Sequence, residues 1–290
     1  MSLIPDFQSS WSSISKCDFW KGGGGGKGPR AIGGLDLRIP ALAGATYHAK
    51  QILYEAEVRG TFRTADGSVE IRSWVPASEN LLVIELTSKG KAVTAEAIPW
   101  IKTGDGSKTA QGTTNDVQWV TRAFPAAGRV FPAEAALAAR CLKADLKSFT
   151  LEPGRPVTIV MAIRSNYDAK LYLDNACNRA LELTSGEVEA LRRTHINWWR
   201  NFWSESYVEI GDPLLEKFYY GSHYIIASCS RNKDFAAAMY GNWTTNDRPS
   251  WTGDYHQNYN YHAPWWGCYS SNHIELTEPY DTPLLEFMPR

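Results

Sequence analysis

The chain has 290 residues, of which 43% are hydrophobic and 21% are charged, and Lys+Arg 30 against Asp+Glu 31 leaves it nearly neutral. The composition is that of an ordinary globular protein. The balanced charge gives no electrostatic reason to expect nucleic acid or an anionic membrane surface as a partner. No apolar run approaches the ~18 residues of a membrane span. The length suits about two domains.

The N-terminus shows no targeting signal, and the cysteines show no disulfide framework or metal site. The opening sequence MSLIPDFQSS lacks a charged start followed by an apolar run, so no signal peptide is visible. We expect a periplasmic or secreted protein only if a natural signal has been removed. Five cysteines are scattered without a CxxC pair or a Cys/His cluster, which favours buried thiols over disulfides or a metal site. We therefore expect no metal and no other cofactor.

From residue 31 to residue 165 the pattern is typical of β-strands, after a glycine run at 22–26 that favours a surface loop over a phosphate loop. Apolar residues between Ile52 and Phe62 alternate with charged ones, which predicts one buried and one solvated side. Ala65-Asp66-Gly67 predicts a hairpin turn. Further strands are expected at 81–86, 92–98, 117–124 and 157–163. Such short strands with turn signals predict an antiparallel β-sandwich.

The apolar period then changes to that of helices, at 171–183 and 187–202. Thr184-x-x-Glu187 is a possible capping box for the second helix. His195 lies on the apolar stripe of that helix, so we expect it to pack rather than to catalyse.

Twelve tryptophans are unusual, and seven of them fall between Trp198 and Trp266. Those at 198, 199 and 203 are expected to pack between domains. Asp212-Pro213 predicts a helix start, with Asp as N-cap and Pro in the first turn, and the helix is expected to reach about Ser230. Prolines near the C-terminus predict short, separate helices there.

The chain is organised around residues 251–266, which hold three Trp, three Tyr, two His, two Asn and one Asp, and no aliphatic side chain larger than Ala. Flat apolar rings mixed with neutral hydrogen-bonding groups suit a pocket for a polyhydroxylated ring, because sugars present both CH faces and hydroxyl edges. The sequence therefore predicts a carbohydrate site. The structural alternative is an aromatic edge of the core whose polar groups are satisfied by backbone.

The polar residues of this stretch are spaced two apart, at His256, Asn258, Asn260 and His262. On an extended chain all four side chains emerge on one side, whereas on a helix the two asparagines point about 200° apart. With Pro264 limiting where a helix can begin, the spacing favours an extended approach to a pocket.

These residues resemble glycoside hydrolase family 95, the inverting α-L-fucosidases and their α-L-galactosidase relatives. The resemblance is loose over Arg72–Asn80 and closer over Trp199–Trp203, Asp212–Tyr220 and Ala227–Arg231. It is most specific at Gly241-Asn-Trp243, Trp251, His256-x-Asn258-x-Asn260, Trp266 and Asn272–Leu276.

The resemblance implies a multidomain β-then-α fold, in which an N-terminal β-sandwich joins an (α/α)6 barrel through linker helices. On that basis we expect the sandwich at residues 1–165, a helical linker at 166–206 and the start of the barrel at 207–290. Twelve helices do not fit in the remaining length, so we expect the chain to be truncated.

The resemblance also implies the roles of the site residues. Asn258 and Asn260 are expected to be catalytic, positioning the attacking water with help from a carboxylate beyond residue 290, where the family's general acid also lies. The expected sugar-binding residues are His256, Trp251, Trp243, Asp254, His262 and Trp266. An amide is a poor base alone, so inversion requires that partner carboxylate.

One departure concerns specificity. Where fucosidases usually continue with Gln-Met-Asn-Tyr-Trp, this chain has Tyr261-His-Ala-Pro-Trp-Trp266, so the pocket differs and the sugar is open. The nearby carboxylates Asp247, Asp254, Glu275 and Glu278 form no recognisable acid–base pair, and Asp254 is equally well explained as an ordinary turn residue. Without its general acid the chain alone is expected to be inactive.

Three functions fit these features. The first is an exo-acting glycoside hydrolase, with a glycan as its partner, acting on terminal α-L-fucosyl or related sugars. A glycoside phosphorylase is the alternative within enzymes, although Arg248 is the only cation close to the motif. A carbohydrate-binding protein without turnover is the alternative outside enzymes.

Overall fold

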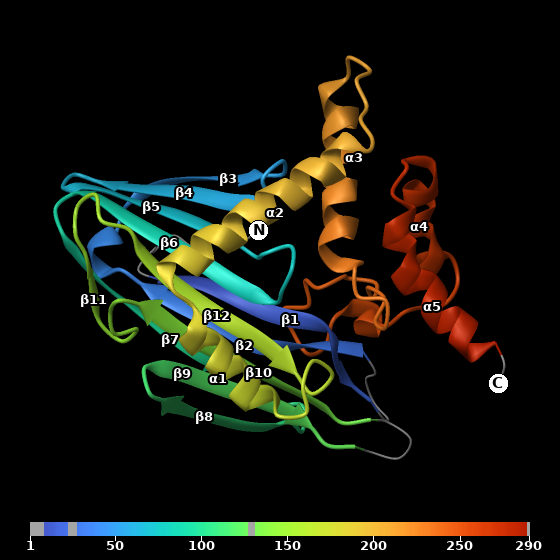
Figure 1. The fold of residues 1–290 in the computed structure, drawn as a ribbon, viewed down its shortest axis with the longest axis horizontal. Coiled ribbons are helices and arrows are strands. Elements are labelled where there is room, and N and C mark those ends of the chain that lie inside the picture. Colours follow the sequence, from blue (N-terminus) through green and yellow to red (C-terminus); the bar gives the residue numbers. More distant parts are fainter. Residues whose placement is uncertain (1–8, 23–27, 127–130, 289–290) are drawn as a thin grey trace. The chain divides into compact units, whose positions relative to one another are not determined.

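The computed structural model describes residues 9–22, 28–126 and 131–288, so most of the predicted glycine loop lies outside the described residues. The chain divides into two compact units, whose elements are labelled in Figure 1. The first unit comprises Met1–Ser13, Ile32–Ala123 and Glu134–Asn197; the second comprises Ile14–Ala31, Phe124–Ala133 and Trp198–Arg290. The predicted domain boundaries after residues 165 and 206 stay a prediction.

Two antiparallel sheets form the β part of the chain (Figure 1). The four-stranded sheet has the order β1 (Ser9–Lys21), β2 (Gly28–Arg38), β7 (Val93–Ile101), β11 (Phe149–Leu151). The eight-stranded sheet has the order β3 (Thr46–Ile52), β4 (Glu57–Thr64), β5 (Gly67–Trp74), β6 (Leu81–Gly90), β12 (Val157–Ser165), β10 (Ala133–Leu142), β9 (Val117–Phe124), β8 (Lys108–Thr114). The predicted β-sandwich is therefore confirmed, with β6, β7, β9 and β12 in the expected places.

The hairpin prediction is also confirmed. Thr64 and Gly67 pair as the last residues of β4 and β5, so Ala65 and Asp66 form a two-residue connection. Gly67 has φ +148, and a Cβ atom at this position would lie 2.1 Å from the carbonyl oxygen of Lys89 on β6. The turn therefore needs glycine both for its backbone conformation and for the close approach of a neighbouring strand.

The central strand β10 lies outside the strands predicted from the sequence. Its sequence AEAALAARCL is rich in Ala, which favours helices in isolation. In the structure β10 pairs with β12, with Ala138 opposite Ala162, and the alanines at 135, 136, 138 and 139 are buried. Small side chains here let neighbouring layers approach closely, so tertiary packing overrides the local propensity.

The predicted alternation between Ile52 and Phe62 is wrong at its centre. The chain turns at residues 53–56 between β3 and β4, and Ala56 adopts φ +48. This turn shifts the side-chain alternation, so Glu57 is 3% exposed while Val58 is 41% exposed. A shift of one residue exchanges the faces of a strand, which explains the reversal.

The buried Glu57 carboxylate is held by cations from two elements. Arg59 Nε donates to Glu57 Oε1 at 2.8 Å, and Arg192 Nη2, from the second helix, lies 3.4 Å from the same oxygen. Burial alone raises the pKa of Glu57, whereas the hydrogen bond from Glu55 and these two guanidinium groups bring it below its ordinary value overall. The ion pairs compensate for the desolvation of a charge in the sheet.

The two helices predicted after the strands are present, as α1 (Tyr172–Glu182) and α2 (Ser185–Ser204). The capping box is present: Thr184 N–H donates to Glu187 Oε2 at 2.7 Å, and Glu187 N–H donates to Thr184 Oγ1 at 3.3 Å. His195 packs as expected, with its ring 5.2 Å from that of Trp74 and Nε2 2.8 Å from the carbonyl oxygen of Glu55.

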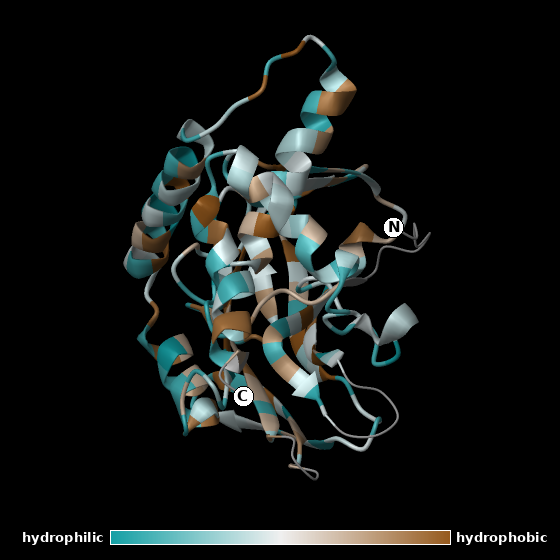
Figure 2. Ribbon diagram, turned by 90° about the vertical axis from the view of Figure 1, so that its right-hand side faces the viewer, coloured by the Kyte–Doolittle hydropathy of each residue, from teal (hydrophilic) through white to brown (hydrophobic). Residues whose placement is uncertain are grey.

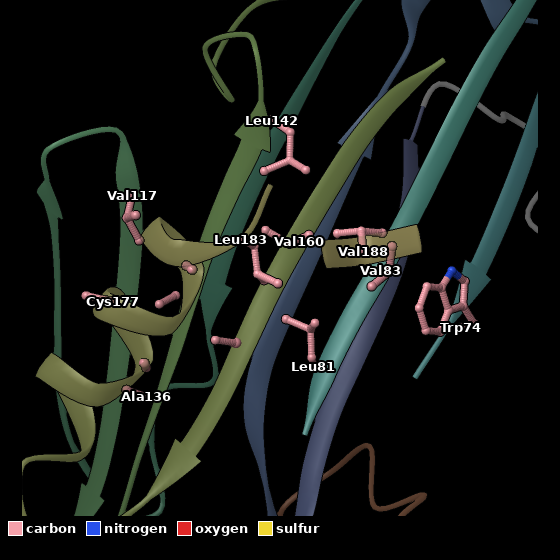
Figure 3. Packing of buried hydrophobic residues seen from close by; sticks show 14 residues of the cluster. Trp74, Leu81, Val83, Val117, Ala136, Leu142, Val160, Cys177, Leu183 and Val188 are labelled. Carbon is pink, nitrogen blue, oxygen red and sulfur yellow. The ribbon is translucent and has the colours of Figure 1, made fainter. Parts of the chain in front are cut away.

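Figure 3 shows the core cluster that these helices share with the eight-stranded sheet. Leu183 and Val188 pack there with Leu81, Val83 and Val160, all buried. Burying each Leu or Val side chain contributes roughly 1.5–3 kcal/mol. In Figure 2 the helices alternate between hydrophilic and hydrophobic residues along their length, as amphipathic helices do.

The second unit contains the remaining helices, α3 (Pro213–Cys229), α4 (Tyr259–Ser270), α5 (Glu278–Phe287) and the short 3-10 turns η2 (Ser250–Gly253) and η3 (Ile274–Thr277). Asp212 caps α3 as predicted, because its side chain accepts from Leu214 N at 2.9 Å and Leu215 N at 3.1 Å. Short helices are present near the C-terminus as predicted, with Pro279 in the first turn of α5, but Pro283 lies inside α5 and does not separate two helices. Among the described residues, no helix combines the length and apolar character needed to cross a membrane.

We expect Glu79→Gln to flatten the acid dependence of stability. Arg179 Nη2 on α1 donates to Glu79 Oε1 at 2.6 Å, and Arg164 Nη2 lies 3.4 Å from Oε2. Burial raises the pKa of Glu79, but the two guanidinium groups outweigh burial and lower it. The carboxylate therefore stabilises the fold above its unfolded pKa, and this contribution is lost as pH falls through the lowered folded pKa.

Urea denaturation between about pH 5 and pH 3 should show a steeper loss for the wild type than for Glu79→Gln. At neutral pH the substitution should cost about 1–3 kcal/mol. Glu182→Gln is the matched control, because Glu182 is the exposed i,i+3 partner of the same Arg179 at 3.9 Å. Equal pH slopes for wild type and Glu79→Gln would contradict the role of this pair.

Candidate functional site

The predicted motif folds around a buried tryptophan. Trp265 is 1% exposed, and its Nε1–H donates to Ser230 Oγ at 2.9 Å and to the carbonyl oxygen of Leu276 at 3.0 Å. Ser230 follows α3 and Leu276 lies in η3, so one indole N–H joins α4 to both elements. The Trp265 ring also stacks on Tyr280 of α5, with centroids 5.2 Å apart. Trp265 is therefore a core residue rather than a sugar platform.

The extended conformation predicted for the motif is wrong from Tyr259 onward. α4 begins there and includes Pro264, so Asn260 and His262 lie on a helix. Asn258 is the N-cap residue and precedes the helix. The two-residue spacing therefore does not align the four polar side chains on one face, because helical positions two apart point about 200° apart.

The inner face of α4 holds Tyr261, Trp265 and Cys268, which are all buried. Burial raises the pKa of the Tyr261 hydroxyl to about 12, so it stays protonated at neutral pH. Burial likewise raises the pKa of the Cys268 thiol to about 11. These groups belong to the core, and neither offers a nucleophile at neutral pH.

The outer face of α4 presents an aromatic group formed by Tyr259, His262 and Trp266. Trp266 is 52% exposed, and its ring centroid lies 5.4 Å from those of both His262 and Tyr259. Tyr259 was part of the aromatic stretch but was not predicted as a site residue. The spacing i, i+3, i+7 would have identified it once the segment is read as a helix.

Asn258 leaves its amide available at the start of α4. Its carbonyl accepts from Tyr261 N–H at 2.9 Å, but its side chain makes no capping hydrogen bond. Asn258 and Asn260 are both exposed. An N-cap asparagine normally uses its side-chain oxygen for the helix, so this exposed amide can hydrogen-bond a ligand or a water instead.

The segment before α4 has a strained backbone. Trp251, Thr252 and His256 have φ values of +56°, +60° and +42°, in the left-handed region that side-chain-bearing residues rarely adopt. Each such residue costs roughly 1–2 kcal/mol. Trp251 is 67% exposed, and its ring centroid lies 5.7 Å from that of His256. Strain of this kind collects where structure holds side chains for a function.

Asp254 holds this segment together. Its Oδ1 accepts from the His256 backbone N–H at 3.1 Å and contacts His256 Nδ1, while Oδ2 accepts from Thr252 Oγ1 at 2.8 Å. The Asp254 carbonyl accepts from Met239 N–H at 3.2 Å. Both carboxylate oxygens therefore have partners inside the segment.

Five of the predicted site residues thus form two groups within the second unit. Trp251, Asp254 and His256 lie together on the segment before α4, and His262 and Trp266 lie together on its outer face. Trp243 is exposed and lies against the backbone of Gly241, which has φ +54, and a Cβ there would be 2.7 Å from the indole ring. Among the described residues, no group of three His, Cys, Asp or Glu side chains is placed to hold a metal ion.

The earlier tryptophans pack inside the same unit. Trp199 stacks on Tyr224 with centroids 5.2 Å apart, and Trp198 stacks on Phe202 at 5.6 Å. Phe202 in turn stacks on His273 at 4.1 Å. They are packing residues, as expected, and their proposed role between domains stays a prediction.

The C-terminal part of the chain matches a known family. Residues 179–289 match the model of the glycosyl hydrolase family 95 catalytic domain, and every predicted site residue lies within this stretch. This match covers less than half of the chain. The family 95 resemblance that was drawn from the motif is thereby confirmed, and the chain is related to enzymes that act on glycosidic bonds.

Two curated relatives and one solved structure extend this comparison. A probable alpha-fucosidase A of Aspergillus niger is 40% identical over 88 residues, and one of Aspergillus oryzae is 41% identical over 69 residues. These alignments cover 29% and 23% of this chain, and 11% and 9% of the relatives. A structure named "Putative kojibiose phosphorylase from human microbiome" matches with a TM-score of 0.51 and 9% identity, over 81% of this chain and 37% of that one. This likeness shows a shared fold, a β-sandwich followed by helices.

We expect the second unit to lose stability as His273 becomes protonated. Its ring is buried against Phe202, with Nδ1 3.4 Å from Glu275 Oε1. Burial lowers the pKa of His273 and outweighs the opposite effect of Glu275. Because the folded pKa is depressed, the unfolded chain binds the proton more readily. Stability is therefore complete above the unfolded pKa and falls as pH drops below it.

His273→Phe should keep the stacking on Phe202 and remove this dependence. Guanidinium denaturation, followed by tryptophan fluorescence, should show the wild type losing up to about 1 kcal/mol per pH unit below pH ~6.5, with a flatter curve for the variant. His262→Phe on the outer face of α4 is the control, and it should leave the curve unchanged. A variant that follows the wild-type curve would rule out His273 as the source.

Proposed function

We propose that this chain supplies the sugar-binding and water-positioning part of an inverting exo-glycoside hydrolase that removes terminal α-L-fucosyl or related sugars. The observation that carries the proposal is the exposed Asn258 amide at the start of α4, in a stretch that matches the family 95 model. The names of the Aspergillus relatives support a fucosyl substrate.

In this proposal Asn258 and Asn260 orient the attacking water. An amide oxygen accepts a hydrogen bond from water but removes a proton poorly, so a carboxylate must accept that proton. Inversion then requires a protonated acid on the opposite side of the sugar ring.

The exposed rings bind the sugar. Trp251, Trp266 and Tyr259 offer flat apolar faces to the CH surface of a pyranose, while His256 and His262 offer hydrogen-bonding edges. Trp243 is exposed and joins them as a further ring in the proposal. Neutral polar groups beside aromatic rings suit an uncharged sugar better than a charged ligand.

In this proposal neither Asp254 nor Glu275 supplies the acid. Both oxygens of Asp254 are engaged, and Glu275 is exposed beside His273. A general acid needs a raised pKa, usually from a poorly solvated environment. We propose that the acid and the assisting base come from a further part of the catalytic domain.

A first test is Asn258→Ala. Because the Asn258 side chain makes no capping bond, its removal should change the free energy of unfolding by less than about 0.5 kcal/mol. Binding of L-fucose, followed by isothermal titration calorimetry, should fall at least about tenfold if a hydrogen bond to the sugar or its water is lost. Asn272→Ala, which removes another exposed asparagine of this unit, is the matched control. Unchanged affinity would place the site elsewhere.

A second test concerns turnover. We expect the 290-residue chain to release no 4-nitrophenol from 4-nitrophenyl α-L-fucoside or α-L-galactoside, because we propose that the general acid lies outside the described residues. Sugar binding without release would fit this expectation, and clear release above the enzyme-free rate would overturn it. The measurement is absorbance of the liberated phenolate.

A sugar-binding protein without turnover is the second candidate, favoured by the engagement of Asp254. An activity assay of a longer catalytic domain distinguishes this candidate from the hydrolase. Glycoside hydrolysis by that longer domain would support the hydrolase. A glycoside phosphorylase has only the fold likeness in its support, and phosphate-dependent release of sugar would be its signature.

A further inference from the structure

The contacts of Asp254 concern the imidazole of His256 as well as the turn. His256 Nδ1 is shielded from solvent and lies in contact with Asp254 Oδ1 without forming a hydrogen bond to any described group, while part of the side chain is exposed. The backbone N–H of His256 and the hydroxyl of Thr252 already bind the carboxylate and close the turn. The additional contact with the ring is therefore not needed to hold the backbone.

The chemistry of this pair determines where the ring proton lies. An ionised carboxylate can only accept hydrogen bonds, so the imidazole nitrogen that faces it carries the hydrogen. In a neutral imidazole the other nitrogen, Nε2, then has a free lone pair and acts as an acceptor. Carboxylates commonly set the tautomer and orientation of a functional histidine in this way.

We propose that Asp254 is a positioning residue that fixes His256 as the Nδ1–H tautomer, so that Nε2 accepts a hydrogen bond from a hydroxyl of the bound sugar. That the hydroxyl belongs to a sugar rests on the proposed function, whereas the tautomer of His256 does not. Asp254 then acts through His256 and does not itself contact the sugar. The proposal accounts for the contact between the carboxylate and the imidazole ring, which closing the turn does not require.

The first experiment reads the tautomer directly on the whole chain. NMR of protein labelled with 15N-histidine at pH ~8, where imidazoles are mostly neutral, should show His256 as Nδ1–H, with its signals assigned by their loss in His256→Gln. Asp254→Ala should shift these signals toward Nε2–H. Asp254→Asn, which keeps an oxygen acceptor, should largely preserve Nδ1–H.

Glu275→Ala is the matched control, because Glu275 lies beside another histidine of the same unit, His273. It should leave the His256 signals unchanged. An Nε2–H tautomer in the wild type, or unchanged His256 signals in Asp254→Ala, would overturn the proposal. If Asp254→Ala does not fold, the tautomer of the wild type decides the question alone.

The second experiment separates positioning from direct contact. L-fucose affinity should fall about tenfold in both Asp254→Ala and His256→Ala, and the double variant should bind no more weakly than His256→Ala alone. Additive losses would show that Asp254 contacts the sugar itself and would overturn its role through His256. If the wild type binds no L-fucose, the proposed function fails while the tautomer measurement still decides the role of Asp254.

Discussion

The hydrogen bonds of the Trp265 indole fix the rotation of α4, and the candidate site depends on that rotation. Leaving a buried N–H without a partner costs about 1–3 kcal/mol, so turning the helix away from Ser230 and Leu276 is unfavourable. Successive helical residues point about 100° apart. With Trp265 inward, Trp266 points outward and meets Tyr259 on the exposed face. One buried donor thus decides which adjacent tryptophan is core and which is free to bind a ligand.

Hydrogen bonds between residues close in the sequence could be predicted, whereas contacts between residues far apart in the sequence could not. The Asp212 cap and the box formed by Thr184 and Glu187 close within four residues, so the partners are visible in the chain itself. Glu57 is different, because its burial depends on Arg192, which is 135 positions away. The Ala-rich strand β10 was missed for a similar reason. Its conformation is set by its neighbours in the sheet, and its composition favours helix.

At the candidate site, the residue types could be read from the sequence but their arrangement could not, and the sugar ligand stays a prediction. Aromatic rings mixed with amides and imidazoles indicated a sugar ligand regardless of conformation. The two-residue spacing from His256 to His262 suggested a single extended face, yet α4 begins between Asn258 and Asn260. Pro264 removes one intrahelical hydrogen bond and crowds the preceding turn. The helix forms nonetheless because Tyr261, Trp265 and Cys268 are buried on its inner face. Because the helix begins after Asn258, the predicted residues divide into those on the segment before α4 and those on α4 itself.

This division gives the two groups different mechanical properties. Trp266 lies on α4 and Asn258 directly precedes it. The orientation of α4 is set by core packing, and sites on helices hold their geometry well. Trp251 and His256 themselves have left-handed backbone conformations. The hydrogen bonds that Asp254 accepts from Thr252 and His256 hold the segment in this conformation. Strain at these positions is stable only because side-chain bonds over-determine the turn. The aromatic and imidazole groups of the segment are therefore preorganised, so ordering them on ligand binding costs less conformational entropy.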